Sequence, residues 1–150
     1  GGYLAMLLAT DPQYLATFGL GPEKIRGVVP ISGFFYIERL APERPASVWG
    51  EDAADWRLAS PASQALENTP PTLLLYAQHD NRARKLESND FARQLRIDST
   101  AEVGIQEMAN RSHATIGIYL MAVEDATSDT MLVFMRRLSE RHPARGIPLY

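Results

Sequence analysis

The apolar residues of this chain fall into short blocks whose spacing switches between that of helices and that of strands. Residues 2–10 place leucines at helical spacing directly after the glycine pair, which predicts a helix that ends near Asp11. The segment 25–32 (IRGVVPIS) is short, apolar and rich in β-branched residues, and it ends at Ser32. This composition predicts a buried strand.

The second half of the chain continues the alternation of strand and helix. Residues 72–77 (TLLLYA) form a continuous apolar run that is too short for a helix, which predicts a central strand. The polar stretch 78–85 predicts a loop, and 88–96 predicts a helix. Residues 101–108 alternate as in a strand, and 128–138 carry apolar residues along one helical face.

Residues 33–70 interrupt this alternation. They are rich in proline and aromatic residues and show no long period. We expect an excursion from the sheet with short helices, one of them near residues 62–66. Residues 141–150 contain further proline and glycine and predict a tail, so the predicted domain spans residues 1–140.

The order of elements predicts an α/β fold in which helices flank a parallel sheet. The pattern contains only three predicted strands, and a helix comes first. A sheet of that size leaves an edge and apolar faces uncovered. We therefore expect these residues to form part of a larger sheet.

Composition narrows the possible partners. The 150 residues are 45% hydrophobic and 22% charged, which is the range of one globular domain. The net charge is -3 without a basic block, which predicts no nucleic-acid partner. The chain has no cysteine and only scattered histidines, so no metal-ligand pattern is present. No apolar run reaches the roughly 20 residues of a membrane span, while compartment and oligomeric state stay open.

Titratable side chains follow two neighbouring predicted strands. Asp80 comes directly after the strand at 72–77, and His113 lies in the predicted loop 109–115 after the next strand. Functional groups of open α/β sheets collect at the carboxyl ends of the strands, so we expect Asp80 and His113 within hydrogen-bond reach. A carboxylate that orients an imidazole prepares it to act as a general base.

The remaining candidates have other interpretations. His79 would point away from a site that contains Asp80, and His142 lies in the predicted tail, so we interpret both histidines as solvated. Ser32 is predicted to be an ordinary strand-end serine, because P-I-S-G-F lacks the earlier glycine of a tight nucleophile turn. Phe34 lies nearest to a strand end among the aromatic residues and is the predicted substrate contact. The alternative role for Asp80 is to cap the next helix.

Several short motifs together resemble one enzyme family. The segments of Asp80 and His113, in that order, resemble the last two triad members of α/β-hydrolase-fold enzymes, whose chain order is Ser, Asp or Glu, His. Residues 1–5 (GGYLA) resemble the second half of the G-x-S-x-G turn that carries the serine in this family. SPAS (60–63) and SHATI (112–116) are most similar to the small esterases and lipases, including their arylformamidase relatives.

This resemblance implies the C-terminal part of an α/β-hydrolase fold with a short lid-like excursion. It implies a serine hydrolase that cleaves small carboxylic esters or activated amides without metal or other cofactor. Asp80 and His113 would be its acid and base, and the serine would lie two positions before Gly1, so the chain holds no nucleophile. The alternatives are a non-catalytic domain of this fold and a prolyl oligopeptidase-like peptidase. The chain departs from the family pattern at Ala77 and at residues 83–84.

Overall fold

The computed structural model describes residues 1–40 and 43–141. The predicted tail beyond Arg141, including His142, lies outside the described residues. The strands are β1 (Thr72–His79) and β2 (Val103–Ser112). The helices are α1 (Gly2–Thr10), α2 (Gln13–Ala16), α3 (Glu43–Trp49), α4 (Ala53–Leu58), α5 (Arg82–Asp98), α6 (Thr115–Ile118) and α7 (Ala126–Arg141). Short 3-10 turns are η1 (Pro22–Lys24), η2 (Ile37–Arg39) and η3 (Pro61–Ser63).

The parallel pairing of β1 with β2 lies at the centre of the fold. Thr72 is opposite Val103, and this register continues to Ala77 opposite Met108. Parallel neighbours need a crossover connection, and α5 supplies it while packing on both strands. The prediction of an α/β fold with a parallel sheet flanked by helices is confirmed.

The segment 25–32 pairs with the other side of β1 but is not a continuous strand. The backbone N–H of Val28 donates to Pro71, and that of Ser32 donates to Leu75, at 2.9 and 2.8 Å. Pro30 lies between them and has no N–H to donate, so the ladder lacks one bond at its middle. The predicted strand is therefore reduced to isolated parallel bridges.

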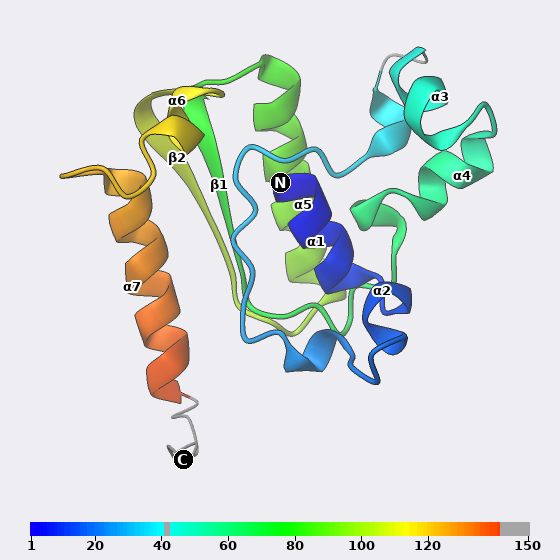
Figure 1. Ribbon diagram of the computed structural model, residues 1–150, viewed down its shortest axis with the longest axis horizontal. Coiled ribbons are helices and arrows are strands. Elements are labelled where there is room, and N and C mark those ends of the chain that lie inside the picture. The colour runs from blue at the N-terminus through cyan, green and yellow to red at the C-terminus, as the bar shows by residue number, and fades with distance from the viewer. Residues whose placement is uncertain (41–42, 142–150) are drawn as a thin grey trace.

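Helices cover both faces of the sheet, with α1 and α5 on one side and α7 on the other (Figure 1). Alternate residues of β1 point to opposite faces. Leu74 belongs to the core that includes Phe91 of α5. Leu73 and Leu75 belong to a second core with Phe134 of α7. Because both faces are buried, the apolar run of β1 is continuous.

Residues 33–40 and 43–70 form the expected excursion, which packs beside α1. Tyr3 of α1 stacks on Phe34 at a ring-centroid distance of 4.6 Å, and Trp49 meets both rings edge-on. The helix predicted near 62–66 is wrong, because the chain forms only the proline-initiated turn η3 there. The longer helices of the excursion are α3 and α4.

Element boundaries differ from the sequence-based prediction at two places beside the candidate residues. Helix α5 begins at Arg82, inside the predicted loop 78–85, because the Asn81 side chain accepts a hydrogen bond from its first turn. Strand β2 continues to Ser112, into the predicted loop 109–115. Both extensions place regular backbone immediately next to the candidate site.

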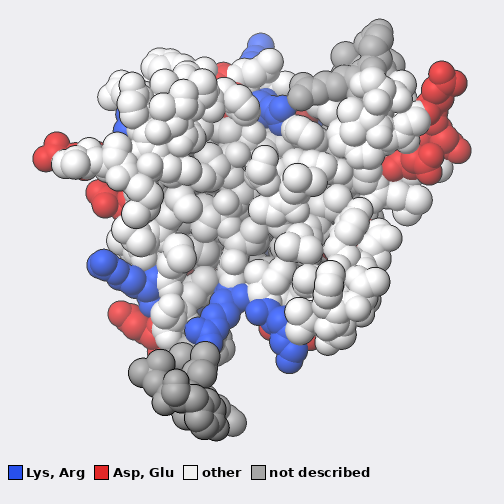
Figure 2. All heavy atoms as spheres, viewed as in Figure 1, with Lys and Arg blue, Asp and Glu red and all other residues white. Residues whose placement is uncertain are grey.

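Charged side chains lie mainly at the rim of the face shown in Figure 2, and the middle of that face carries few. Helix α1 contains no charged residue and exposes Leu4 and Leu8 by 64% and 40%. Within residues 1–40 and 43–141, no helix has both the length and the apolar character that crossing a bilayer requires.

Phe91 tests the core beneath α5. Its ring stacks on Phe35 at 4.6 Å, and the two side chains are 0% and 1% exposed. We expect Phe91→Ala to lower the free energy of unfolding by about 3–5 kcal/mol, because it leaves a cavity. Ile97→Ala, on the same helix but 76% exposed, is the matched control. Urea unfolding followed by circular dichroism measures both, and equal losses would contradict this core.

Candidate active site

Asp80 and His113 meet at the carboxyl edge of the sheet. Nδ1 of His113 lies 3.1 Å from Oδ1 and 3.2 Å from Oδ2 of Asp80. The Asp80 side chain is 1% exposed, and that of His113 is 60% exposed. A buried carboxylate thus faces one imidazole nitrogen while the rest of the ring reaches solvent. In this geometry the acid can hold Nδ1–H and leave Nε2 free to act as a base.

A turn directly after β1 presents the Asp80 carboxylate. The backbone N–H of Asp80 donates to the carbonyl of Ala77 at 3.1 Å. The backbone N–H of Asn81 donates to Oδ1 of Asp80 at 2.9 Å. Asn81, and not Asp80, caps α5, so the alternative capping role of Asp80 is wrong. His79 is exposed, as expected.

An irregularity in the sheet bends the end of β2. The register shifts at His79, which lies opposite Ser112. Asn110 has a φ of 55° in this stretch, and its backbone N–H donates to the side chain of Gln78 at 3.0 Å. Gln78 thereby replaces a lost bond of the ladder. Such bulges bend a strand and redirect its side chains, here toward the loop that carries Asp80.

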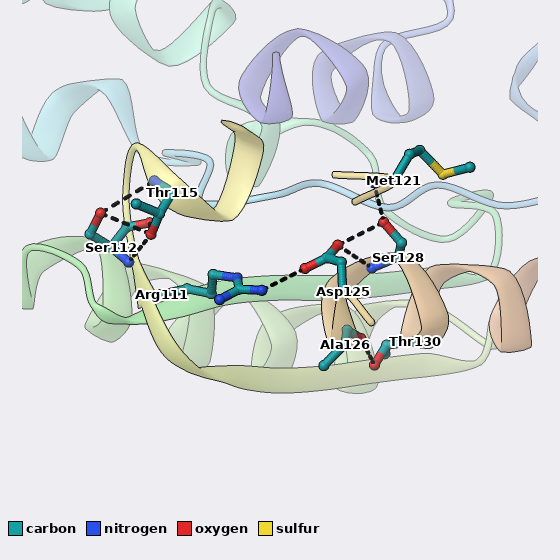
Figure 3. Close-up of polar contacts among 8 residues, drawn as sticks. All are labelled: Arg111, Ser112, Thr115, Met121, Asp125, Ala126, Ser128 and Thr130. Atoms are coloured by element: carbon teal, nitrogen blue, oxygen red, sulfur yellow. Dashed lines mark hydrogen bonds and ion pairs between the residues drawn. The ribbon is translucent and has the colours of Figure 1, made fainter. Parts of the chain in front are cut away.

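A tight turn with His113 at its tip follows β2. The backbone N–H of Ser112 donates to Oγ1 of Thr115 at 2.7 Å, and the backbone N–H of Thr115 donates to Oγ of Ser112 at 3.2 Å. This reciprocal arrangement resembles the capping box of longer helices and joins the end of β2 to Thr115, the first residue of α6 (Figure 3). It restricts the backbone on both sides of the imidazole.

Arg111 and Asp125 connect the end of β2 to the start of α7 (Figure 3). The guanidinium of Arg111 donates to Oδ1 of Asp125 at 2.9 Å, and the Asp125 side chain is 0% exposed. Oδ2 of Asp125 accepts from the backbone N–H and the hydroxyl of Ser128 at 2.8 and 2.7 Å. Burial alone raises the pKa of Asp125, but the hydrogen bonds from Ser128 and Arg111 outweigh it and lower the pKa to about 2.

A hollow of about 280 Å³ opens beside His113. Its walls come from the start of α1, the segment 25–32 and the region of α6. The lining residues are Gly1, Gly2, Ala5, Val29, Ile31, Ser32, His113, Ile116, Gly117 and Leu120. Apart from His113 and Ser32, these side chains are apolar or absent. The hollow can therefore hold a small apolar group next to the imidazole.

Ser32 lies at the end of the segment 25–32, as expected, but in a conformation that a regular strand does not have. It is 5% exposed, and its φ is 46°. Its Oγ is buried without a hydrogen-bond partner among the described residues. A left-handed backbone at a residue other than glycine is strained, and such strain gathers at functional sites. No sequence signal in P-I-S-G distinguishes this conformation from a plain strand end.

The start of α1 packs directly on the same strand end. A Cβ atom on Gly2 would lie 2.6 Å from the carbonyl oxygen of Ile31, closer than carbon and oxygen can approach. Gly2 is therefore required by the contact between two backbones. This contact brings the first residues of the chain into the wall of the hollow.

Phe34, the predicted substrate contact, does not line this hollow. Its half-buried ring packs against Tyr3 and Trp49. The guanidinium of Arg84 lies 4.5 Å above the centre of the same ring. Phe34 thus belongs to the packing between α1 and the excursion, and its contact with substrate stays a prediction.

The buried acidic residue Glu87 has a structural role. Glu87 is 6% exposed and accepts the backbone N–H of Phe35 at 3.2 Å. Burial raises the pKa of Glu87 above its usual value. Among residues 1–40 and 43–141, no three His, Cys, Asp or Glu side chains gather closely enough to hold a metal ion.

Comparison with known proteins identifies solved structures of similar fold. No known protein family and no curated protein matches the sequence. A thermophilic esterase from the Planctomycetes species Thermogutta terrifontis, with propionate bound, has a TM-score of 0.67 and 15% identity, over 94% of this chain and 52% of its own. A truncated carbohydrate esterase from gut microbiota has a TM-score of 0.71 and 16% identity, over 93% and 56%.

A further match is Thermogutta terrifontis esterase 2 phosphonylated by cyclosarin. It has a TM-score of 0.65 and 11% identity, over 93% of this chain and 50% of its own. The chain thus spans about half the length of the solved structures that it matches. At these identities the likeness shows the fold, and this chain has the α/β-hydrolase-like fold of these esterases.

The pKa of Asp125 predicts an acid-sensitive contribution to stability. A carboxyl whose pKa is lower in the folded state than in the unfolded state stabilises the fold when the pH is above the unfolded-state pKa. This contribution is lost as the pH falls through the folded-state pKa. Its pKa falls from 3.8 to about 2. This difference corresponds to about 2 kcal/mol, lost between about pH 4 and pH 2.

Urea unfolding at a series of pH values measures this loss in wild type and in Asp125→Asn. We expect the variant to be less stable at pH 7 and to lose less stability between pH 4 and pH 2. Asp129→Asn removes the same charge from an exposed position on the first turn of α7 and serves as control. An Asp125→Asn profile that follows wild type would contradict the low pKa of Asp125.

Proposed function

We propose that this chain carries the acid and the base of a serine hydrolase that cleaves small carboxylic esters. The observation that supports this proposal is the contact between Nδ1 of His113 and the buried carboxylate of Asp80. A mostly apolar hollow lies beside the same imidazole. The fold is shared with esterases, which favours ester hydrolysis among the reactions that a carboxylate and an imidazole can support.

In the proposed reaction, Nε2 of His113 accepts the proton of a serine hydroxyl while the serine oxygen bonds to the ester carbonyl carbon. Asp80 accepts a hydrogen bond from Nδ1–H and stabilises the imidazolium. The carbon–oxygen bond to the alcohol then breaks, and His113 returns the proton to the leaving alcohol. Water activated by His113 hydrolyses the acyl-enzyme to a carboxylic acid and free serine.

We place the nucleophilic serine before Gly1 in the full protein. Residues 1–5 (GGYLA) are similar to the end of a nucleophile turn, and Gly1 lies in the wall of the hollow. Among the described residues that line the hollow, Ser32 is the one serine, and its Oγ is buried. Backbone N–H groups of the proposed turn would bind the oxyanion. A Gly-x-Ser-x encoded before Gly1 supports the proposal, whereas another residue at the serine position indicates a non-catalytic domain.

The hollow favours esters with a short apolar chain. Its volume is about 280 Å³, and its walls offer aliphatic side chains and glycines. The Thermogutta terrifontis esterase of the same fold holds propionate in its solved structure. We propose acyl groups of about this size as substrates, with the apolar chain in the hollow and the carbonyl near His113.

Substitution of the two proposed catalytic residues tests the reaction. In the full protein that contains this chain, we expect Asp80→Asn and His113→Gln each to lower kcat for p-nitrophenyl acetate by about 10⁴-fold. In Asp80→Asn the imidazole loses the acid that fixes its tautomer, and in His113→Gln the serine loses its base. His79→Gln changes the exposed neighbouring histidine and is the matched control, with kcat near wild type. Undiminished hydrolysis by His113→Gln would remove His113 from the mechanism.

Gly117 tests the assignment of the hollow. Gly117 lines the hollow, and a Cβ atom at this position would meet no atom within 4 Å. A larger side chain is therefore accommodated here without a backbone shift. We expect Gly117→Leu to lower kcat/KM for p-nitrophenyl butyrate about tenfold more than for the acetate, because the longer chain loses its space. Ile118→Leu, at the next and exposed position, is the control. Equal losses for both esters would show that the chain binds elsewhere.

A further inference from the structure

We propose that Arg111 and Asp125 are positioning residues that hold His113 against Asp80. The inference rests on the proposed function, since that function gives the imidazole its role. Arg111 and Asp125 do not line the hollow beside the imidazole. They act through the backbone on either side of the segment 112–124, which begins one residue before His113.

Apolar packing does little to fix this segment. From His113 to Glu124, all of which the structure describes, Ile116 is the one buried residue. Ile118, Met121 and Val123 are 72%, 77% and 94% exposed. A loop with so few buried apolar contacts opens locally at low cost unless polar contacts hold it. The position of the imidazole therefore depends on hydrogen bonds and ion pairs.

The backbone of the segment is also strained. Met121 and Glu124 have φ values of 66° and 60°, in the left-handed region that glycine favours. Conformations of this kind persist only where the surroundings determine them. The surroundings here are polar: the backbone N–H of Met121 donates to Oγ of Ser128 at 2.7 Å, and the same hydroxyl donates to Asp125.

The Arg111–Asp125 ion pair links the two ends of the segment 112–124. Arg111 lies two residues before His113, and its guanidinium reaches across to Asp125 at the start of α7 (Figure 3). The guanidinium also lies 5.2 Å from the ring centre of Tyr119 within the segment. Buried ion pairs add little net stability over apolar residues of the same size, but their geometry is directional. We therefore assign this pair a role in geometry.

The tautomer of His113 reports its contact with Asp80 and does not require hydrolysis. With Nδ1 against the carboxylate, the proton of the neutral ring belongs on Nδ1. Ring ¹⁵N chemical shifts of His113 in the full protein, recorded with the ring neutral, measure the ratio of the two tautomers. The chain has three histidines, and His113→Gln assigns the signal. Asp80→Asn defines the spectrum of an imidazole without its acid.

Arg111→Met breaks the ion pair but leaves the hydrogen bonds between Asp125 and Ser128 intact. We expect it to lower the ratio of Nδ1–H to Nε2–H at least about tenfold, toward the ratio in Asp80→Asn, as for loss of a hydrogen bond to a charged group. Arg141→Met breaks an arginine–glutamate pair with Glu102 at the other end of α7 and is the matched control. Its ratio is expected to equal wild type.

The outcomes separate the two claims. A folded Arg111→Met with the wild-type tautomer ratio overturns the positioning role and leaves the proposed function standing. If Asp80→Asn also keeps the wild-type ratio, the pairing of acid and base fails, and both claims fall. If Arg111→Met does not fold, Asp125→Asn breaks the pair from its other side, and the same two outcomes decide.

Discussion

Parallel pairing around β1 is the constraint on which the rest of the structure depends. It places the ends of the segment 25–32, of β1 and of β2 at one edge of the sheet. Ser32 is the last residue of the first segment, and Asp80 and His113 directly follow β1 and β2, so three residues far apart in sequence come together. Burial of both sheet faces by α1, α5 and α7 makes the pairing register costly to change. The site therefore inherits its geometry from the core.

The end of β2 shows how a regular sheet is adapted to present one side chain. A bulge at Asn110 bends the strand, a reciprocal turn at Ser112 orients the backbone, and the Arg111–Asp125 pair holds the following segment. Each device is polar, because the segment lies at the surface and Ile116 is its one buried apolar residue. The His113 side chain is thus largely exposed, while polar contacts hold the backbone on both sides of it. This arrangement suits a group that must exchange protons with a substrate.

The periodicity of apolar residues predicts the α/β fold, because it is a local pattern. The contact between Asp80 and His113 is predicted from the ends of two neighbouring strands, because parallel strands end at the same edge of a sheet. Pro30 interrupts the segment 25–32 because it cannot donate a hydrogen bond to β1, and α5 begins early because the Asn81 side chain caps it. Both effects depend on the groups that these residues meet in the fold. The left-handed φ of Ser32 and the Arg111–Asp125 pair arise from tertiary contacts, which no local pattern encodes. The ring of Phe34 stacks on Tyr3, a tertiary contact that its position near a strand end does not encode, and its contact with substrate stays a prediction.

The most direct test of the account is the location of a fluorophosphonate adduct in a protein that contains this chain together with the proposed serine before Gly1. The serine oxygen bonds to phosphorus and fluoride leaves, so peptide mapping by mass spectrometry identifies the nucleophile. The account predicts one modified serine, outside residues 1–150, whose labelling is lost in His113→Gln, and no adduct on this chain expressed alone. An adduct on Ser32, or labelling that persists without His113, would contradict it.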